Sequence, residues 1–140
     1  MDNHEKSLDL TPLLGYTTTM SNIINGYEIK PEANLQAADL SEANLHRANL
    51  QSANLNYAKL SNSFLLGANL HGAGLFHADL EGADLNYADL QNAYLLGADL
   101  SNANLAGADL RGADLRRVNL EGANLEGAVI STGWKITKIP

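Results

Sequence analysis

Three histidines in the middle of the chain, His46, His71 and His77, are the residues best suited to bind a metal or transfer a proton. The 140 residues also include 16 Asp and Glu, which could act with them as ligands or as acid and base. There is no cysteine, so a disulfide framework, a thiolate metal site and a cysteine nucleophile are excluded. Whether the remaining groups can cooperate depends on the elements that position them.

A five-residue repeat decides where these side chains lie. From Ala33 onward, Leu recurs at every fifth position up to Leu125, and Ile130 completes 20 consecutive units. Two residues before the Leu, 18 of the 20 units have Ala, and one residue before it, 15 have Asn or Asp. Two residues after the Leu, 11 units have Gly or Asn. Such self-similarity is the signature of a stacked repeat architecture.

A period of five fits neither a helix nor a flat strand. On an α-helix the leucines would spiral around the whole circumference, and on a strand they would alternate between the two faces. A chain that turns a corner once per unit buries all of them, and the two residues after each Leu can form a type II turn, whose third residue has a positive φ. Four corners make a square coil, so we expect about five coils with a dry Leu and Ala interior.

The repeat, as in residues 38–42 (ADLSE) and 108–112 (ADLRG), resembles the pentapeptide-repeat family. The resemblance implies an all-β fold, a right-handed quadrilateral β-helix, over residues 31–132, and its Leu-centred form is abundant in cyanobacteria. Within such a helix, residues 20 apart stack on one side. The interior column of the first side therefore contains the following leucines: Leu35, Leu55, Leu75, Leu95 and Leu115.

Both ends of a solenoid need a cap, because an open end exposes apolar side chains and unpaired strand edges. Residues 1–30 lack the repeat, and we expect an N-terminal cap there, partly mobile, with a short helix starting at Thr11 and Pro12 or an irregular structure. Residues 133–140, with Trp134, are expected to cover the last coil, or alternatively to form a weak end-to-end dimer contact. No secretory signal or membrane-length apolar run is visible, so we expect a cytoplasmic protein that does not enter a membrane.

Each side of the square is named here by its first leucine. On the Leu35 side, exposed apolar and aromatic residues gather in the middle coils and form what we call the aromatic patch: Tyr57, Phe76, His77, Tyr94 and Leu96. The opposite Leu45 side carries a smaller cluster of Phe64, Leu66 and Tyr87. Such a patch is typical of a protein-binding surface, but stacked side chains could equally serve only to shield the backbone.

The Leu40 side is strongly acidic, and we call it the acidic face. Its carboxylates, opposed by Lys59 alone, are Asp39, Glu42, Asp79, Glu81, Asp99 and Glu121. Regular carboxylates on a rod could imitate a nucleic-acid backbone in a basic groove. The alternative, which we favour, is that Asp and Asn before each Leu bond the local backbone, since eight of the 15 are neutral Asn.

The three histidines fall on different sides and coils, so the sequence predicts no metal site. No catalytic set or phosphate-binding loop stands out, and we expect neither enzymatic activity nor a cofactor. The leading prediction is a scaffold that binds an unidentified protein partner and does not bind nucleic acid directly. The alternative is a DNA-mimicking inhibitor of a type II topoisomerase such as gyrase, as the resemblance implies for some members of the family.

Overall fold

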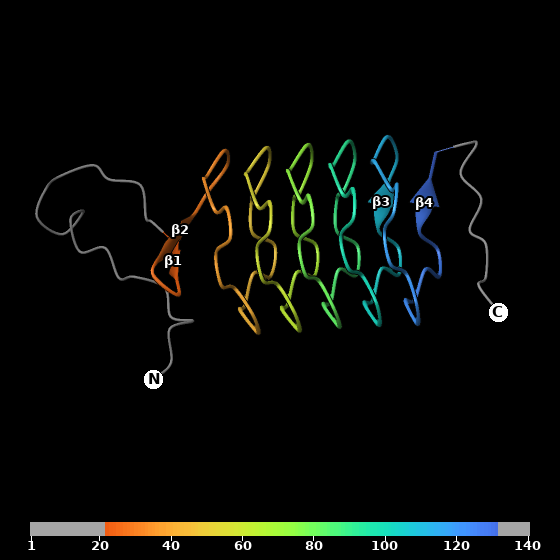
Figure 1. Ribbon diagram of the computed structural model, residues 1–140, viewed down its shortest axis with the longest axis horizontal. Coiled ribbons are helices and arrows are strands. Elements are labelled where there is room, and N and C mark those ends of the chain that lie inside the picture. The colour runs from red at the N-terminus through yellow and green to blue at the C-terminus, as the bar shows by residue number, and fades with distance from the viewer. Residues whose placement is uncertain (1–21, 132–140) are drawn as a thin grey trace, which may run out of the picture.

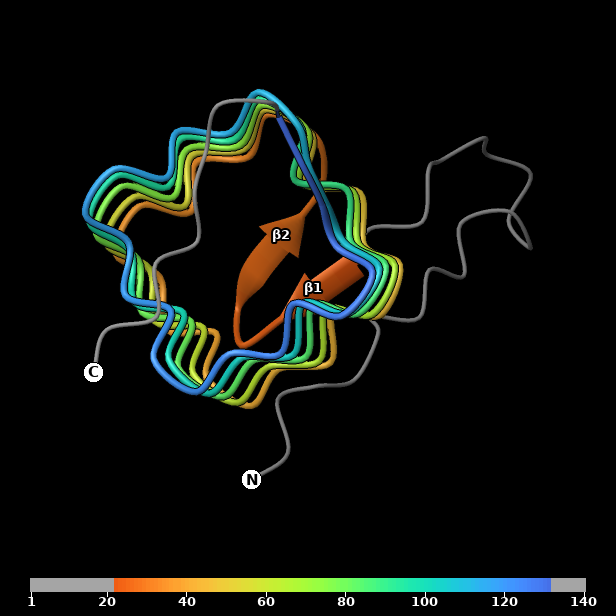
Figure 2. The ribbon, with the colours of Figure 1, turned by 90° about the vertical axis from the view of Figure 1, so that its right-hand side faces the viewer.

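The computed structural model describes residues 22–131, most of which form a stack of four-sided coils (Figure 1). Seen along the stack, the coils superimpose as a square with a corner in each five-residue unit (Figure 2). The five-residue period thus produces the coil that the sequence predicts. In this part of the chain, no helix has the length and apolarity needed to cross a membrane.

Neighbouring coils are joined by parallel pairing between residues 20 apart, such as Asn34 with Asn54. The Leu35 N–H donates to the Asn54 carbonyl at 2.7 Å, and the Asn54 N–H donates to the Ala33 carbonyl at 2.9 Å. The same register joins the two short strands β3 (Asp109–Leu110) and β4 (Val129–Ile130). Each coil therefore satisfies its backbone through the coils on either side of it.

The corners are the predicted type II turns. In all 19 units from Ala37 to Gly127, the residue two positions after the Leu has a positive φ between 51° and 73°. The turn is closed by a hydrogen bond such as that from the Ala38 N–H to the Leu35 carbonyl, at 3.0 Å. Eight of these 19 residues are neither Gly nor Asn, so the repeat imposes the left-handed conformation even where the residue type does not favour it.

The interior is filled by the leucine and alanine columns. Four of the five leucines predicted inside the Leu35 side are buried, from Leu35 at 2% exposed to Leu95 at 0%. Leu115, in the last described coil, is only half-buried. The leucine interior is therefore confirmed, with the last described coil more open than the rest.

A β-hairpin closes the N-terminal end of the stack. Strands β1 (Asn22–Ile24) and β2 (Tyr27–Ile29) pair antiparallel and lie across the end of the square (Figure 2). Ile24 and Ile29 are each 6% exposed and belong to the same core as the first coils. The apolar faces of this hairpin thus cover the end of the leucine column.

Within the predicted N-terminal cap, this regular hairpin is a feature that the sequence analysis did not predict. Asn25 and Gly26 have φ values of 51° and 83°, the left-handed pair that a tight hairpin turn requires. The Asn25 side chain also donates to the Asp39 carbonyl at 3.2 Å, which ties the hairpin to the first coil. The predicted helix start at Thr11 and Pro12 and the predicted C-terminal cap at residues 133–140 lie outside the described residues.

Candidate functional site

The residue before each Leu has a structural task that does not depend on charge. All fifteen Asn and Asp residues at this position accept a hydrogen bond from the N–H two residues further on, for example Asp99 from Ser101 at 2.9 Å. Eight of the fifteen are Asn, and they make the same bond as the aspartates. The position therefore selects a short side chain with an acceptor oxygen. This supports the local interpretation of Asp39, Asp79 and Asp99.

Some units have another residue in place of Asn or Asp at this position and so lack the local hydrogen bond. At Gly74 the bond is replaced from the preceding coil, since Asn56 Oδ1 accepts from the Phe76 N–H at 3.0 Å. A Cβ on Gly74 would lie 2.9 Å from that same oxygen, so the glycine makes room for the substitute. Phe64 and Tyr94 carry no acceptor that could make the local bond. The side chains of these two residues therefore do not supply the local hydrogen bond that Asn or Asp makes at this position.

Three of the five residues of the predicted aromatic patch are in direct contact. The rings of Tyr57 and His77 stack nearly parallel, with centroids 5.9 Å apart and an interplanar angle of 10°. Phe76 meets both edge-on, at 5.4 Å from Tyr57 and 4.3 Å from His77. These contacts join two successive coils, yet Tyr57 remains 52% exposed. The cluster thus presents ordered aromatic surface to the solvent.

The other two residues extend the patch into the next coil. Tyr94 pairs with Gly74 in the parallel ladder and is 62% exposed. Leu96 is half-buried and follows Phe76 in the same outer column, one coil further along. The His77 ring lies against the backbone of Gly97, where an added Cβ would be only 2.6 Å from His77 Cε1. The structure therefore brings all five predicted residues onto one side of three consecutive coils.

On the acidic face, the charges follow one another along a single column. In the parallel backbone ladder, Lys59 lies between Asp39 in the preceding coil and Asp79 in the next. Asp79 is followed in the same ladder by Asp99. Hydrogen bonds from the Ser41 side chain and backbone lower the pKa of Asp39, and the nearby charge of Lys59 acts in the same direction. Asn119 donates to Asp99 Oδ1 at 3.2 Å. The hydrogen bonds from Ser41 therefore favour the charged form of Asp39.

Several of the other charged groups form ion pairs, whereas those of the acidic face do not in the described part of the chain. Arg111 binds Asp109 and Arg116 binds Asp114, with closest N–O distances of 2.5 and 2.7 Å. Hydrogen bonds from the arginines lower the pKa of each aspartate, and the aspartates raise the pKa of each arginine. Within residues 22–131, none of the six carboxylates of the acidic face takes part in an ion pair. This face therefore keeps its charge available.

The histidines lie in separate environments. His77 belongs to the ring stack, and His71 Nδ1 lies 3.9 Å from Asp89 Oδ2 on the Leu50 side. In the part of the chain that the structure describes, no three His, Cys, Asp or Glu residues gather as a metal would require. The described surface groups best suited to recognition are therefore aromatic rings and carboxylates.

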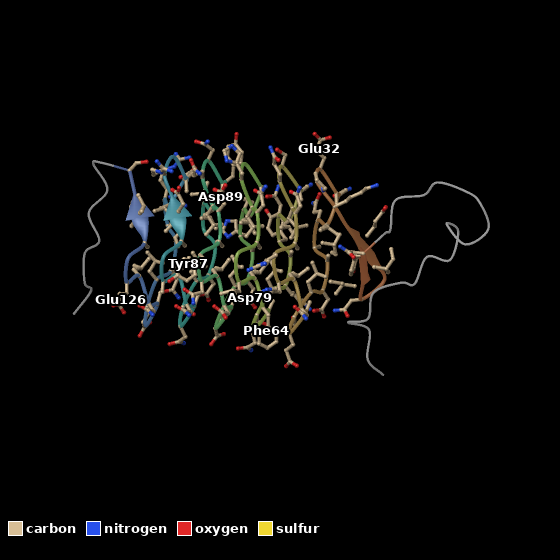
Figure 3. The ribbon with its side chains drawn as sticks, turned by 180° about the vertical axis from the view of Figure 1, so that it is seen from behind. Glu32, Phe64, Asp79, Tyr87, Asp89 and Glu126 are labelled. Atoms are coloured by element: carbon tan, nitrogen blue, oxygen red, sulfur yellow. The ribbon has the colours of Figure 1, made fainter. Side chains whose placement is uncertain are left out.

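The smaller cluster on the Leu45 side is open to solvent. Phe64 is 54% and Tyr87 71% exposed, and both are labelled in Figure 3. The Tyr87 ring lies against Gly107, where an added Cβ would approach Tyr87 Cε1 to 2.5 Å. Aromatic residues thus occur on two opposite sides, with the acidic face between them.

The comparisons with known proteins agree on one repeat family. The family described as Pentapeptide repeats matches residues 32–65, 65–95 and 93–131, in eight copies. A pentapeptide repeat protein, Rfr23, from the cyanobacterium Cyanothece 51142 is 42% identical, with a TM-score of 0.65, over 66% of this chain and 64% of that one. The match thus spans just under two thirds of that relative. None of the curated proteins searched matches the sequence.

Other solved structures are more distant. A pentapeptide repeat protein of the Arabidopsis thaliana thylakoid lumen is 35% identical over 69% of this chain and 64% of that one, with a TM-score of 0.38. The plasmid-mediated fluoroquinolone resistance protein QnrB1 is 21% identical over 73% of this chain and 79% of that one, with a TM-score of 0.36. The QnrB1 likeness carries no argument about function.

Proposed function

Because the chain belongs to the pentapeptide repeat family, a group of right-handed quadrilateral β-helices, we propose that it is a non-enzymatic scaffold that binds a protein partner through the aromatic patch. Proteins of this family are generally non-enzymatic scaffolds and often mediate protein interactions, which supports the proposal. A solid leucine interior leaves the outer columns as the surface for recognition.

The observation that carries this proposal is the ordered, exposed ring cluster of Tyr57, Phe76 and His77. Tyr57 and His77 occupy corner positions with φ values of 60° and 51°, where Gly or Asn would be conformationally easier. Tyr94 gives up the local hydrogen bond that an Asn or Asp would make. Residues that work against the local preferences of a fold are candidates for function.

Truncation of Phe76 and Leu96 to Ala tests the proposal. We expect the Phe76→Ala and Leu96→Ala double variant to lose capture of the partner from a lysate of the native organism, identified by mass spectrometry. Both side chains are only half-buried, so the melting temperature should stay nearly unchanged. A matched control is Leu66→Ala, which removes an outer leucine from the Leu45 side. Capture that survives the double variant would assign the patch a merely structural role.

The second candidate is a DNA mimic that inhibits a type II topoisomerase, and the concentration of unpaired charge on the acidic face favours it. This face has six carboxylates against one lysine, whereas the rest of residues 31–130 has six carboxylates against four arginines. Against it, the aspartates among them make the same local bond as neutral asparagines. A gyrase supercoiling assay decides, since a mimic must inhibit when the protein is titrated to micromolar concentrations.

A further inference from the structure

Aromatic residues border the acidic face on both of its long edges. In one coil, residues 57–64 run from the corner at Tyr57, across Lys59 on the acidic face, to Phe64 at the start of the Leu45 side. Tyr57 is 52% and Phe64 54% exposed. In the next coil, His77 occupies the same corner and its ring stacks on Tyr57. Asp79 then takes the position on the acidic face that Lys59 has in the coil before. Exposed rings therefore lie at the edges of the acidic face in the middle coils.

This juxtaposition is suited to a cationic ligand. A guanidinium or ammonium group can lie over an exposed ring while it bonds a carboxylate beside that ring. Arginine suits both contacts best, because its planar group stacks on rings and binds a carboxylate with two N–H groups. The carboxylates of Asp79 and Asp99 follow one another in adjacent coils, about 4.8 Å apart along the stack. A series of cations along one chain could therefore meet a series of acceptors.

Within residues 22–131, little positive charge competes for the acidic face. Lys59 is the one cation among its outward residues, and within residues 22–131 it forms no ion pair with the carboxylates on either side of it. Two of the four arginines of the repeat are bound to Asp109 and Asp114, and Arg117 occupies, in the last described coil, the same corner column as Tyr57 and His77. A second copy of this chain would present the same acidic charge and would be repelled.

From these observations we infer that the acidic face, with Tyr57 and Phe64 at its edges, binds an arginine-rich extended segment of the partner protein. This inference rests on the proposed function and specifies the chemistry of the partner. The side is a wall of stacked coils (Figure 1), which suits an extended chain that lies along it. Charge complementarity steers such a segment to this face, and the rings then hold its guanidinium groups.

A direct binding measurement with a defined probe tests the inference. The probe is a short fluorescein-labelled peptide in which Arg alternates with Ser, titrated with the full chain and followed by fluorescence anisotropy at about 0.15 M ionic strength. Two matched peptides replace Arg with Lys or with Gln. We expect binding in the order Arg, Lys, Gln, with no saturable binding of the Gln peptide, because stacking on rings favours guanidinium over ammonium.

The key variant is Asp79→Asn with Asp99→Asn, because Asn keeps the local hydrogen bond that fifteen units make at this position. The charge control is Asp89→Asn with Glu126→Gln, which removes two charges from other sides; both residues are labelled in Figure 3. We expect the first variant to raise the dissociation constant of the Arg peptide about fivefold or more. The control should raise it less than about twofold, since exposed charge pairs contribute modestly and locally.

A third variant, Tyr57→Gly with Phe64→Asn, removes the aromatic edges and follows the repeat at both positions. Glycine accepts the φ of 60° at residue 57, and asparagine restores an acceptor at residue 64, so the coil is retained. This variant should abolish the preference for Arg over Lys. Equal weakening by the two charge variants, or no saturable binding of the Arg peptide to the unaltered chain, would overturn the inference. Neither result touches the proposed function, which depends on partner capture through Phe76 and Leu96.

Discussion

The interior and the outer columns of the stack use the same five-residue unit under different constraints. Inside, every leucine from Leu50 to Leu105 is 0% exposed, and one residue type fills the position in each coil. Outside, the column that follows the leucines of the Leu35 side changes completely from coil to coil: Gln36, Asn56, Phe76, Leu96 and Arg116. The interior must be packed without voids, whereas among these outer side chains only Asn56 bonds the backbone of the next coil. The fold and the function are therefore specified by different columns.

The largest expected effect comes from a change inside. Leu80→Ala removes a side chain that is 0% exposed and leaves a cavity between the neighbouring coils. We expect the free energy of unfolding to fall by about 2–5 kcal/mol, as measured by chemical denaturation. The matched surface change is Leu96→Ala, where the half-buried side chain leaves no enclosed cavity, and its cost should stay below about 1 kcal/mol. Similar losses for both would mean that the outer columns also hold the fold together.

Sequence reasoning worked where a constraint is repeated many times. The positive φ at Ala37 and at Gly127 belongs to one turn that recurs in 19 units, so Gly and Asn in part of them were enough to predict all. The burial of the leucines follows from the same period. The five residues of the aromatic patch could be placed on one side because residues 20 apart stack, although the contacts among their rings could not be derived.

Features that occur once were harder to predict. The hairpin turn at Asn25 and Gly26 carries a strong signal, Asn-Gly between apolar residues. A helix start was predicted at Thr11 and Pro12 instead, and this signal was not used. The bond from the Phe76 N–H to Asn56 Oδ1 was missed because it compensates for Gly74 from another coil. Such a replacement depends on the distance between coils, which the pattern within one unit does not contain.

A smaller loss of stability is expected when a corner glycine beside the aromatic patch is replaced. Gly97→Ala places a methyl group at a φ of 70° and 2.6 Å from His77 Cε1, so the ring must leave its stack on Tyr57. The left-handed conformation costs alanine about 1–2 kcal/mol, and displacement of the ring adds to this cost. Denaturation gives the change in stability, and the capture assay should show weaker binding of the partner.

Gly72→Ala is the control for this change. Its φ of 66° is similar, but the added methyl group would meet only Ser52 Oγ at an ordinary 3.5 Å. We expect the conformational cost alone, with partner capture unchanged. If both glycine variants capture the partner equally well, the stack of His77 on Tyr57 is not required for recognition.

The smallest effect concerns pH and the aspartates whose hydrogen bonds hold their pKa below the usual value of 3.8. These bonds come from Ser41 to Asp39, from Arg111 to Asp109 and from Arg116 to Asp114. Because folding lowers these pKa values, it favours the charged carboxylates; the resulting stabilisation is present above the unfolded pKa and is lost as the pH falls through the folded values. The melting temperature should therefore fall on acidification below about pH 4. A variant with Asn at all three positions keeps a neutral acceptor at every pH, so its melting temperature should fall less on acidification. An equal fall in melting temperature for the variant and the unaltered chain would contradict this account.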